Sequence, residues 1–249
     1  MKIVKKFFGA IGYKLIDKDY IKSLRITEKF LCPPEKFIKS LIKKKKIKKI
    51  IQVGANDGVR DDFLNKCLKK NISIIFVEPI PSAFERLKYN YRNFKKAIFL
   101  NKAIDTKKTK KKIFSINPKF SNHYENGYND GDMEWLSVLA SFKKKHLENH
   151  GIKENHIISK NISTLTFKEI IQKYNFFNLD LIVIDTEGFD AILVMNFLKT
   201  INSRPIIVFE HLHISRNNLE SVLKILNKNN YNIIKTESDF ICFQKNFFF

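Results

Sequence analysis

The sequence predicts an α/β fold built on a mostly parallel seven-stranded sheet that ends in an antiparallel C-terminal hairpin. Strand-like and helix-like segments alternate from about residue 47 onward, as they do in α/β proteins. Several of the strand-like segments are continuously apolar, which is typical of parallel strands buried on both faces. Only Ser238 and Asp239 separate the last two strands, and so short a link permits only an antiparallel hairpin.

Seven segments carry the pattern of strands, and helical patterns lie between them. In chain order the strands are Lys48–Val53, Ser73–Glu78, Ala97–Ile104, Leu181–Asp185, Pro205–Glu210, Tyr231–Glu237 and Phe240–Gln244. The helical patterns are Asp61–Lys70, Ser82–Tyr91, Thr166–Tyr174, Phe189–Lys199 and Asn218–Asn227. One more strand-like segment, Lys111–Ile116, is expected to extend the third strand as an edge hairpin.

Residues 1–45 are predicted to form a basic, amphipathic helical segment, and residues 46–249 the main domain. Apolar residues recur at roughly helical spacing between Ile3 and Ile16, with lysines between them. Such a helix either packs on the main domain, which we favour slightly, or lies on an anionic membrane surface through residues 1–30. The paired prolines Pro33 and Pro34 end this segment.

Residues 117–135 interrupt the alternation with a loop rich in asparagine, aromatic and acidic residues. Long loops inside compact domains are usually functional lids or disordered spacers. Because aromatic faces and amides suit a sugar, we interpret this loop as a substrate lid. A helix is expected to follow it near Leu136–Leu147.

The composition favours a packed protein that acts in the cytoplasm. Hydrophobic residues make up 44% of the 249 residues, and no apolar run approaches the roughly 20 residues that a bilayer span requires. The three cysteines have no zinc-type spacing and suit a reducing interior. No secretory signal is apparent, so we expect a cytoplasmic protein, with peripheral membrane attachment through the basic leader as an option.

The net charge of +21 suggests nucleic acid as a partner, but its distribution argues against this class. The charge comes from runs of lysine, whereas arginine, which binds phosphates and base edges as a planar fork, is rare. We therefore interpret most of the charge as solvated surface, and keep nucleic acid as an unlikely partner.

The strand ending at Val53 runs into a glycine-bearing turn, and the next strand ends on the single carboxylate of Glu78. A carboxylate in that place suits the two hydroxyls of a ribose. A dinucleotide fingerprint beginning at Gly54 would need glycine at Asn56 and Val59, so a pyrophosphate is not expected. A phosphate-free nucleoside such as S-adenosylmethionine fits better, and a purely structural turn capped by Asp57 is the alternative.

Two further groups of polar residues follow strands that end at the same edge of the predicted sheet, where ligands bind. Asp185 and Glu187 come first; they could hold a divalent metal, bind the positive end of the cofactor, or take a hydroxyl proton. Glu210, His211 and His213 follow the next strand. A histidine there is a candidate general base or metal ligand, and we favour His213 over His211. Asp190 is interpreted as a helix cap.

Together these blocks resemble the FkbM family of S-adenosylmethionine-dependent methyltransferases. The similarity rests on Val53–Gly58, Phe76–Pro79, Ser163–Thr166, Ile184–Asp190 and Pro205–Glu210, and extends over about residues 48–245. It implies a Rossmann-like class I methyltransferase fold and methyl transfer to hydroxyls of sugars or natural products. It also implies a cofactor site that includes Gly54, Asn56 and Glu78, and it matches the acidic turn at Asp185, Glu187 and Gly188.

We therefore expect an S-adenosylmethionine-dependent O-methyltransferase that acts on a sugar hydroxyl of a polysaccharide or glycolipid. The alternatives are an RNA- or other nucleic-acid-directed methyltransferase and a basic nucleic-acid-binding protein. The predicted catalytic residues are Asp185, Glu187 and His213. The predicted cofactor-binding residues are Gly54, Ala55, Asn56, Gly58, Glu78, Pro79 and Asp105. No metal ligand is assigned, because the sequence is compatible with a divalent metal but does not require one.

Overall fold

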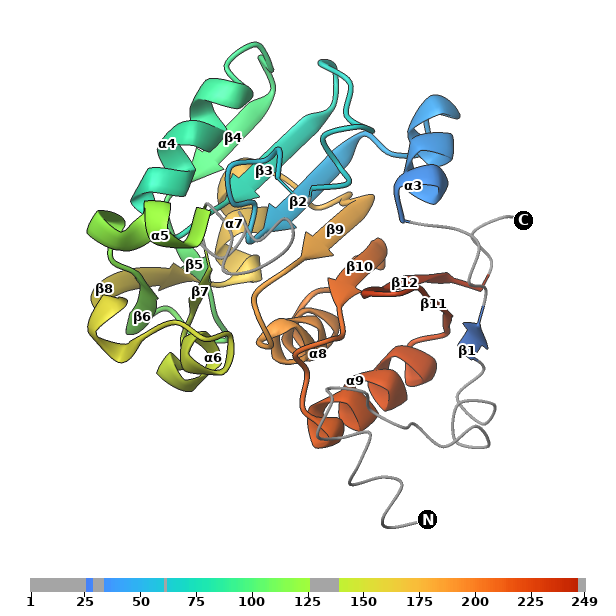
Figure 1. Cartoon of the computed structure of the whole chain (residues 1–249). Coiled ribbons are helices and arrows are strands. Elements are labelled where there is room, and N and C mark those ends of the chain that lie inside the picture. The colour runs from blue at the N-terminus through green and yellow to red at the C-terminus, as the bar shows by residue number, and fades with distance from the viewer. Residues whose placement is uncertain (1–25, 29–33, 61, 126–138, 246–249) are drawn as a thin grey trace.

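The computed structural model describes residues 26–28, 34–60, 62–125 and 139–245. The helical pattern predicted between Ile3 and Ile16 falls on residues outside these ranges, as do residues 126–135 of the predicted lid, whereas the described part of the predicted segment 1–45 contains a short strand and a helix. Within the described residues the main sheet has eight strands (Figure 1) in the order β1-β11-β12-β10-β9-β2-β3-β4. Their bounds are β1 Ile26–Glu28, β2 Lys49–Val53, β3 Ser73–Val77, β4 Ala97–Leu100, β9 Leu181–Ile184, β10 Ile206–Glu210, β11 Tyr231–Lys235 and β12 Asp239–Gln244.

The predicted topology is confirmed. Strand β12 pairs antiparallel with both β10 and β11, whereas the other neighbouring strands of this sheet are parallel. The short strand β1 adds to the predicted seven by pairing with β11 at one edge. The order reverses next to β2, so the carboxyl ends of β2 and β9 open onto a crevice where ligands of such sheets bind.

Apolar residues that alternate along each central strand build a core on both faces of the sheet. Ile51, Ile75 and Ile182 pack with three helices on one face: α7 Phe167–Tyr174, α8 Asp190–Thr200 and α9 Arg216–Lys228. Ile50 and Ile74 pack on the other face with α3 Pro34–Lys43 and α4 Pro81–Asn90. Burial on both faces explains why these strands read as continuous apolar runs.

The predicted helix at Asp61–Lys70 is wrong, because the described residues 62–70 form turns. Leu64 and Cys67 are buried against the sheet at helical spacing, which accounts for the misleading pattern. Asp62 explains the turn: its Oδ1 accepts the backbone N–H of Leu64, and its Oδ2 accepts the amide of Gln52. A side chain that binds nearby backbone in this way competes with a helix.

A second, four-stranded sheet was not predicted. It has the order β5-β8-β6-β7, with β5 Ala103–Ile104, β6 Lys110–Ile116, β7 Ala140–Ser141 and β8 Ile157–Leu165. The predicted third strand, Ala97–Ile104, therefore divides between the two sheets. The edge hairpin is also wrong, since β6 pairs with the polar strand β8 instead of the third strand.

The helix predicted near Leu136–Leu147 is only partly correct. Its described part contains strand β7 followed by helix α6 Lys144–Asn149. The 3-10 turn η1 Pro118–Phe120 and the helix α5 Ser121–Glu125 occupy the start of the predicted lid. Figure 1 shows the second sheet with α5 and α6 as a lobe beside the ends of β2 and β9. No described helix is long and apolar enough to cross a membrane.

Within this lobe an ion pair joins β6 to the segment after β5. Lys111 Nζ lies 2.6 Å from Asp105 Oδ2 and stacks over the rings of Phe142 and Phe189, at 5.1 and 4.9 Å from their centroids. The Asp105 side chain is only 3% exposed. We expect Lys111→Met to lower the free energy of unfolding by about 2–3 kcal/mol, because it leaves a buried carboxylate without its cation. Denaturant unfolding measures this; Lys112→Met, at the next and exposed position of β6, should change it by less than about 0.5 kcal/mol.

Candidate active site

The turn after β2 brings the ends of three strands together. The N–H of Gly54 donates to the carbonyl of Val77 at the end of β3, at 2.9 Å, and the N–H of Asp185 donates to the carbonyl of Val53, at 3.0 Å. Gly54 has φ +75°, and a Cβ built on it would lie 1.6 Å from the carbonyl oxygen of Asp185. Only glycine fits here, because any side chain would overlap the backbone of the neighbouring strand.

Glu78 lies directly beyond β3, and its carboxylate braces the same turn. Its Oε2 accepts the N–H of Asn56 at 2.8 Å, and its Oε1 accepts the N–H of Ile80 at 2.7 Å. Asn56 adopts a left-handed φ of +47°, a strained backbone of the kind found at ligand-binding turns. Burial raises the pKa of Glu78 to about 7, although both backbone bonds act in the opposite direction.

Two cavities meet at this turn. The first, of about 110 Å³, is a narrow slot whose lining includes Glu78 and Pro79. The second, of about 590 Å³, falls within the 300–1,000 Å³ typical of ligand pockets. Four residues line both of them: Gly54, Asn56, Asp185 and Glu187. Ligands in the two cavities would therefore lie in contact across the ends of β2 and β9.

The larger cavity is acidic, in a chain whose net charge is +21. Five carboxylates line it, against one guanidinium, that of Arg60; they are Asp62, Asp185, Glu187, Glu210 and Asp239. Burial raises the pKa of Asp185 above its ordinary value and that of Glu210 to about 10, and repulsion from the neighbouring carboxylates adds to both shifts. Burial raises the pKa of Asp62 to about 6 and also that of Asp239. This cavity therefore favours cations and groups that release protons.

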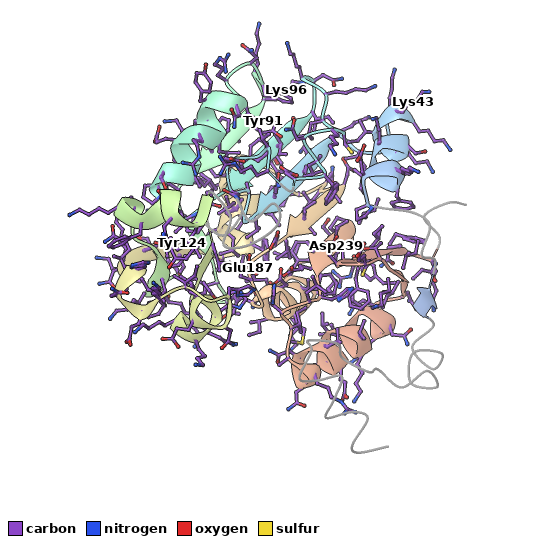
Figure 2. The ribbon with its side chains drawn as sticks, viewed as in Figure 1. Lys43, Tyr91, Lys96, Tyr124, Glu187 and Asp239 are labelled. Atoms are coloured by element: carbon purple, nitrogen blue, oxygen red, sulfur yellow. The ribbon has the colours of Figure 1, made fainter. Side chains whose placement is uncertain are left out.

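His213 lines the larger cavity, and His146 lies behind it against Glu187. His146 Nε2 lies 2.8 Å from Glu187 Oε2, and His213 Nε2 lies 3.7 Å from the same oxygen and 3.7 Å from Glu210 Oε1. His146 belongs to α6, so the second sheet's lobe contributes directly to the site. Figure 2 shows Glu187 between that lobe and the strand ends of the main sheet.

Comparison with known proteins assigns the chain to a family. The family model of the methyltransferase FkbM domain matches residues 52–233, well over half of the chain. The protein belongs to the FkbM methyltransferase family. The resemblance expected from the sequence is thereby confirmed, and the topology described above is the Rossmann-like class I methyltransferase fold. Comparison with curated protein sequences finds no significant match.

Solved structures similar to this FkbM methyltransferase include several methyltransferases. They include a SAM-dependent O-methyltransferase from Thermotoga maritima, with 10% identity, 86% of this chain and 56% of that chain covered, and a TM-score of 0.39. A methyltransferase from Geobacter sulfurreducens has 7% identity, with 95% of this chain and 94% of that chain covered, and a TM-score of 0.41. A precorrin-6y C5,15-methyltransferase from Geobacter metallireducens has 10% identity, coverage of 91% and 94%, and a TM-score of 0.38. These similarities are too weak to indicate a substrate.

The FkbM family and its fold imply S-adenosylmethionine as the cofactor, and the slot contains groups that fit it. Glu78 offers a carboxylate to the ribose hydroxyls. The side-chain Oδ1 of Asn56 is buried and has no hydrogen-bond partner among the described residues, so it can accept from a ligand. Gly54 lets the cofactor approach the backbone where a Cβ would otherwise stand. The residues present therefore fit the cofactor.

Most predicted site residues of this FkbM methyltransferase lie at the two cavities. Ala55 and His213 line the larger one and Pro79 the smaller one. The structure does not bring Asp105 or Gly58 into either lining: Asp105 pairs with Lys111, and the carbonyl of Gly58 accepts the hydroxyl of Tyr91 at 2.8 Å. Their role at the cofactor stays a prediction.

Two other expectations near the site are changed. Asp190 does not cap α8; its carboxylate accepts the N–H groups of Thr186 and Gly188, both at 3.0 Å, and so braces the turn that carries Glu187. His211 is directed away, with Nε2 3.2 Å from the carbonyl of Thr236, whereas His213 faces the cavity. Sequence reasoning missed His146, although it lay in the predicted helix Leu136–Leu147 and four residues before His150.

Proposed function

We propose that the protein is an S-adenosylmethionine-dependent O-methyltransferase that methylates a hydroxyl, most simply a sugar hydroxyl of a polysaccharide or glycolipid. The observation that carries this proposal is the shared wall of the two cavities. The slot with the carboxylate of Glu78 shares Asp185 and Glu187 with a cavity lined by carboxylates and by the imidazole of His213. This arrangement suits a methyl donor on one side and an acceptor that must lose a proton on the other.

The bound cofactor supplies an activated methyl group on a positively charged sulfur. The residues around it align the acceptor and handle one proton. The methyl carbon forms a bond to the acceptor oxygen while its bond to sulfur breaks, so the products are a methyl ether, a neutral thioether and a proton. We assign that proton to the cluster of Asp185, Glu187 and His213. His146 contacts Glu187 and adds a fourth side chain to this cluster.

Glu187→Gln should lower kcat by roughly 100- to 1,000-fold, because it removes a charge at the centre of this cluster. The affinity for S-adenosylmethionine should change by less than about threefold, since Glu78 and Asn56 are untouched. The measurement is transfer of an isotope-labelled methyl group to glycans extracted from the host, with cofactor affinity from calorimetry. Glu85→Gln on exposed α4 is the matched control, and equal activity of the two variants would contradict the proposal.

The acceptor itself is tested by mass spectrometry of host glycans with and without the gene. The proposal requires the glycan of the deleted strain to lack the mass of one CH₂ unit for each methyl group. Unchanged glycans, together with labelled methyl groups on RNA, would favour the nucleic-acid alternative that the net charge of +21 suggests. The acidic cavity weighs against that alternative, because carboxylates repel a phosphate backbone.

A further inference from the structure

Three of the six histidines of the chain meet at one point beside the larger cavity. The ring centroids of His146 and His150 are 4.5 Å apart, those of His146 and His213 4.7 Å, and those of His150 and His213 5.0 Å. One ring nitrogen of each lies within 4.8 Å of the others. Three imidazoles gathered in this way, two from the end of α6 and one from the segment after β10, are a typical ligand set for a transition metal.

Hydrogen bonding fixes one of these rings in the form that a metal needs. His150 Nδ1 lies 2.8 Å from the backbone carbonyl oxygen of His146, which can only accept a hydrogen bond. In the neutral ring Nδ1 therefore carries the hydrogen and Nε2 carries the lone pair. A ligating histidine usually donates its second ring N–H to a carbonyl or carboxylate in this way.

Glu187 lies beside two of these rings. Its Oε2 lies 2.8 Å from His146 Nε2 and 3.7 Å from His213 Nε2. Donors bound to one Zn²⁺ at about 2.0–2.2 Å lie about 3–4 Å from one another, so the ring nitrogens, which lie within 4.8 Å of one another, need to approach by about 1 Å at most. The backbone of Glu187 is held in a left-handed conformation, φ +54°, by the Asp190 carboxylate that braces its turn. Such strain in a non-glycine residue is typical of ligand clamps.

We propose that His146, His150 and His213 bind one divalent transition-metal ion of the Zn²⁺ type, with the Glu187 carboxylate beside His146 and His213. Imidazole donors favour zinc, iron, cobalt or nickel over magnesium and calcium, which prefer oxygen. The cavity holds five carboxylates and one guanidinium, and a bound cation would favour the ionised form of those carboxylates. The ion joins α6 of the second lobe to the strand ends of the main sheet.

Binding of this ion goes beyond the proposed function and does not depend on it. Its use does rest on that function: three protein ligands leave a fourth position open on zinc, so the ion would be able to bind an acceptor hydroxyl oxygen and make its proton easier to remove. Asp185, which lines both cavities, is then the candidate to receive that proton.

Calorimetric titration of the full chain with Zn²⁺ tests the site. The protein is purified without a histidine tag and stripped with a chelator, and neither cofactor nor acceptor is added. We expect one ion per chain, and an affinity lower by roughly 100-fold or more in His150→Ala. His123→Ala, which changes an exposed histidine of α5, is the matched control and should bind Zn²⁺ as the wild type does.

A second readout needs no variant. Cobalt(II) added to the stripped wild-type protein should give the intense visible absorption of a four-coordinate ion, and one equivalent of Zn²⁺ should abolish it. Absence of saturable binding at one ion per chain, or equal affinity in wild type, His146→Ala and His150→Ala, would overturn the proposal. Calorimetry with S-adenosylmethionine on the same protein separates the metal site from the proposed function. If S-adenosylmethionine does not bind, the proposed methyl transfer is contradicted and the metal site is not.

Discussion

Gly54→Ala is expected to lower the free energy of unfolding by about 4 kcal/mol or more, which would leave much of the protein unfolded. The added Cβ would stand 1.6 Å from the carbonyl oxygen of Asp185, a distance that only separation of β2 from β9 can relieve. The φ of +75° adds strain for any L side chain. Urea unfolding followed by circular dichroism measures the loss, which exceeds ordinary single-residue effects because the clash is with backbone.

Gly151 provides the matched control for this prediction. It has a similar φ of +80°, but nothing lies within 4 Å of the position of an added Cβ. Gly151→Ala should therefore cost only the conformational strain, about 1 kcal/mol. Equal losses in the two variants would show that strain alone, and not the contact between the strands, makes glycine necessary at position 54.

Glu78→Ala is expected to weaken the binding of S-adenosylmethionine by roughly 100- to 1,000-fold. Hydrogen bonds to a charged group contribute about 1.5–3 kcal/mol each, and this carboxylate can accept from two ribose hydroxyls. It also holds the turn through the N–H groups of Asn56 and Ile80. Calorimetry measures the affinity, with Glu85→Ala as the control, and an affinity within threefold of wild type would refute the ribose assignment.

The pH dependence of Glu78 follows from its pKa of about 7. Because only the ionised carboxylate accepts from both hydroxyls, the cofactor affinity should fall as the pH drops below about 7, approaching tenfold per pH unit. Glu78→Gln should remove this dependence as well as weaken binding. If the pH dependence of the cofactor affinity persists unchanged in Glu78→Gln, a group other than Glu78 causes it.

The stability of the cofactor-free protein should respond in the opposite sense. The pKa of Glu78 is raised on folding, from 4.5 to about 7, so its contribution to stability is complete below 4.5 and is lost as the pH rises through 7. Glu78→Gln should therefore be more stable than the wild type at pH 8, by about 2–3 kcal/mol, and equal to it near pH 4.5. Thermal unfolding at the two pH values measures this difference.

The main sheet could be predicted because its sequence signals are local. Continuous apolar runs marked β2, β3, β9 and β10, and the short link before β12 left one possible pairing. The second sheet could not, because β8 exposes Ser159–Asn161 to solvent and gains its stability from pairing with β6, which is distant in the sequence. Propensity and pattern carry little information about such a strand.

The acidic part of the site was predictable for the same reason, since Asp185, Glu187 and Glu210 directly follow apolar strands. The contribution of His146 and His150 was not, because it depends on how the second lobe folds against the first. That packing is set by contacts such as the stacking of Lys111 of β6 over the ring of Phe189 beside α8, which join residues of the two lobes. Sequence reasoning therefore found the carboxylates at the strand ends and missed the histidines that the second lobe contributes.

Gly54, Asn56, Asp185 and Glu187 face both cavities at once. A substitution at any of them that suited a new acceptor would also disturb the methyl donor, so these positions leave little freedom for an enzyme to change its substrate. Phe63, Leu139 and Leu212 line the larger cavity alone. Engineering of acceptor range should begin with these three, where a change can alter what is methylated without altering how the methyl group is supplied.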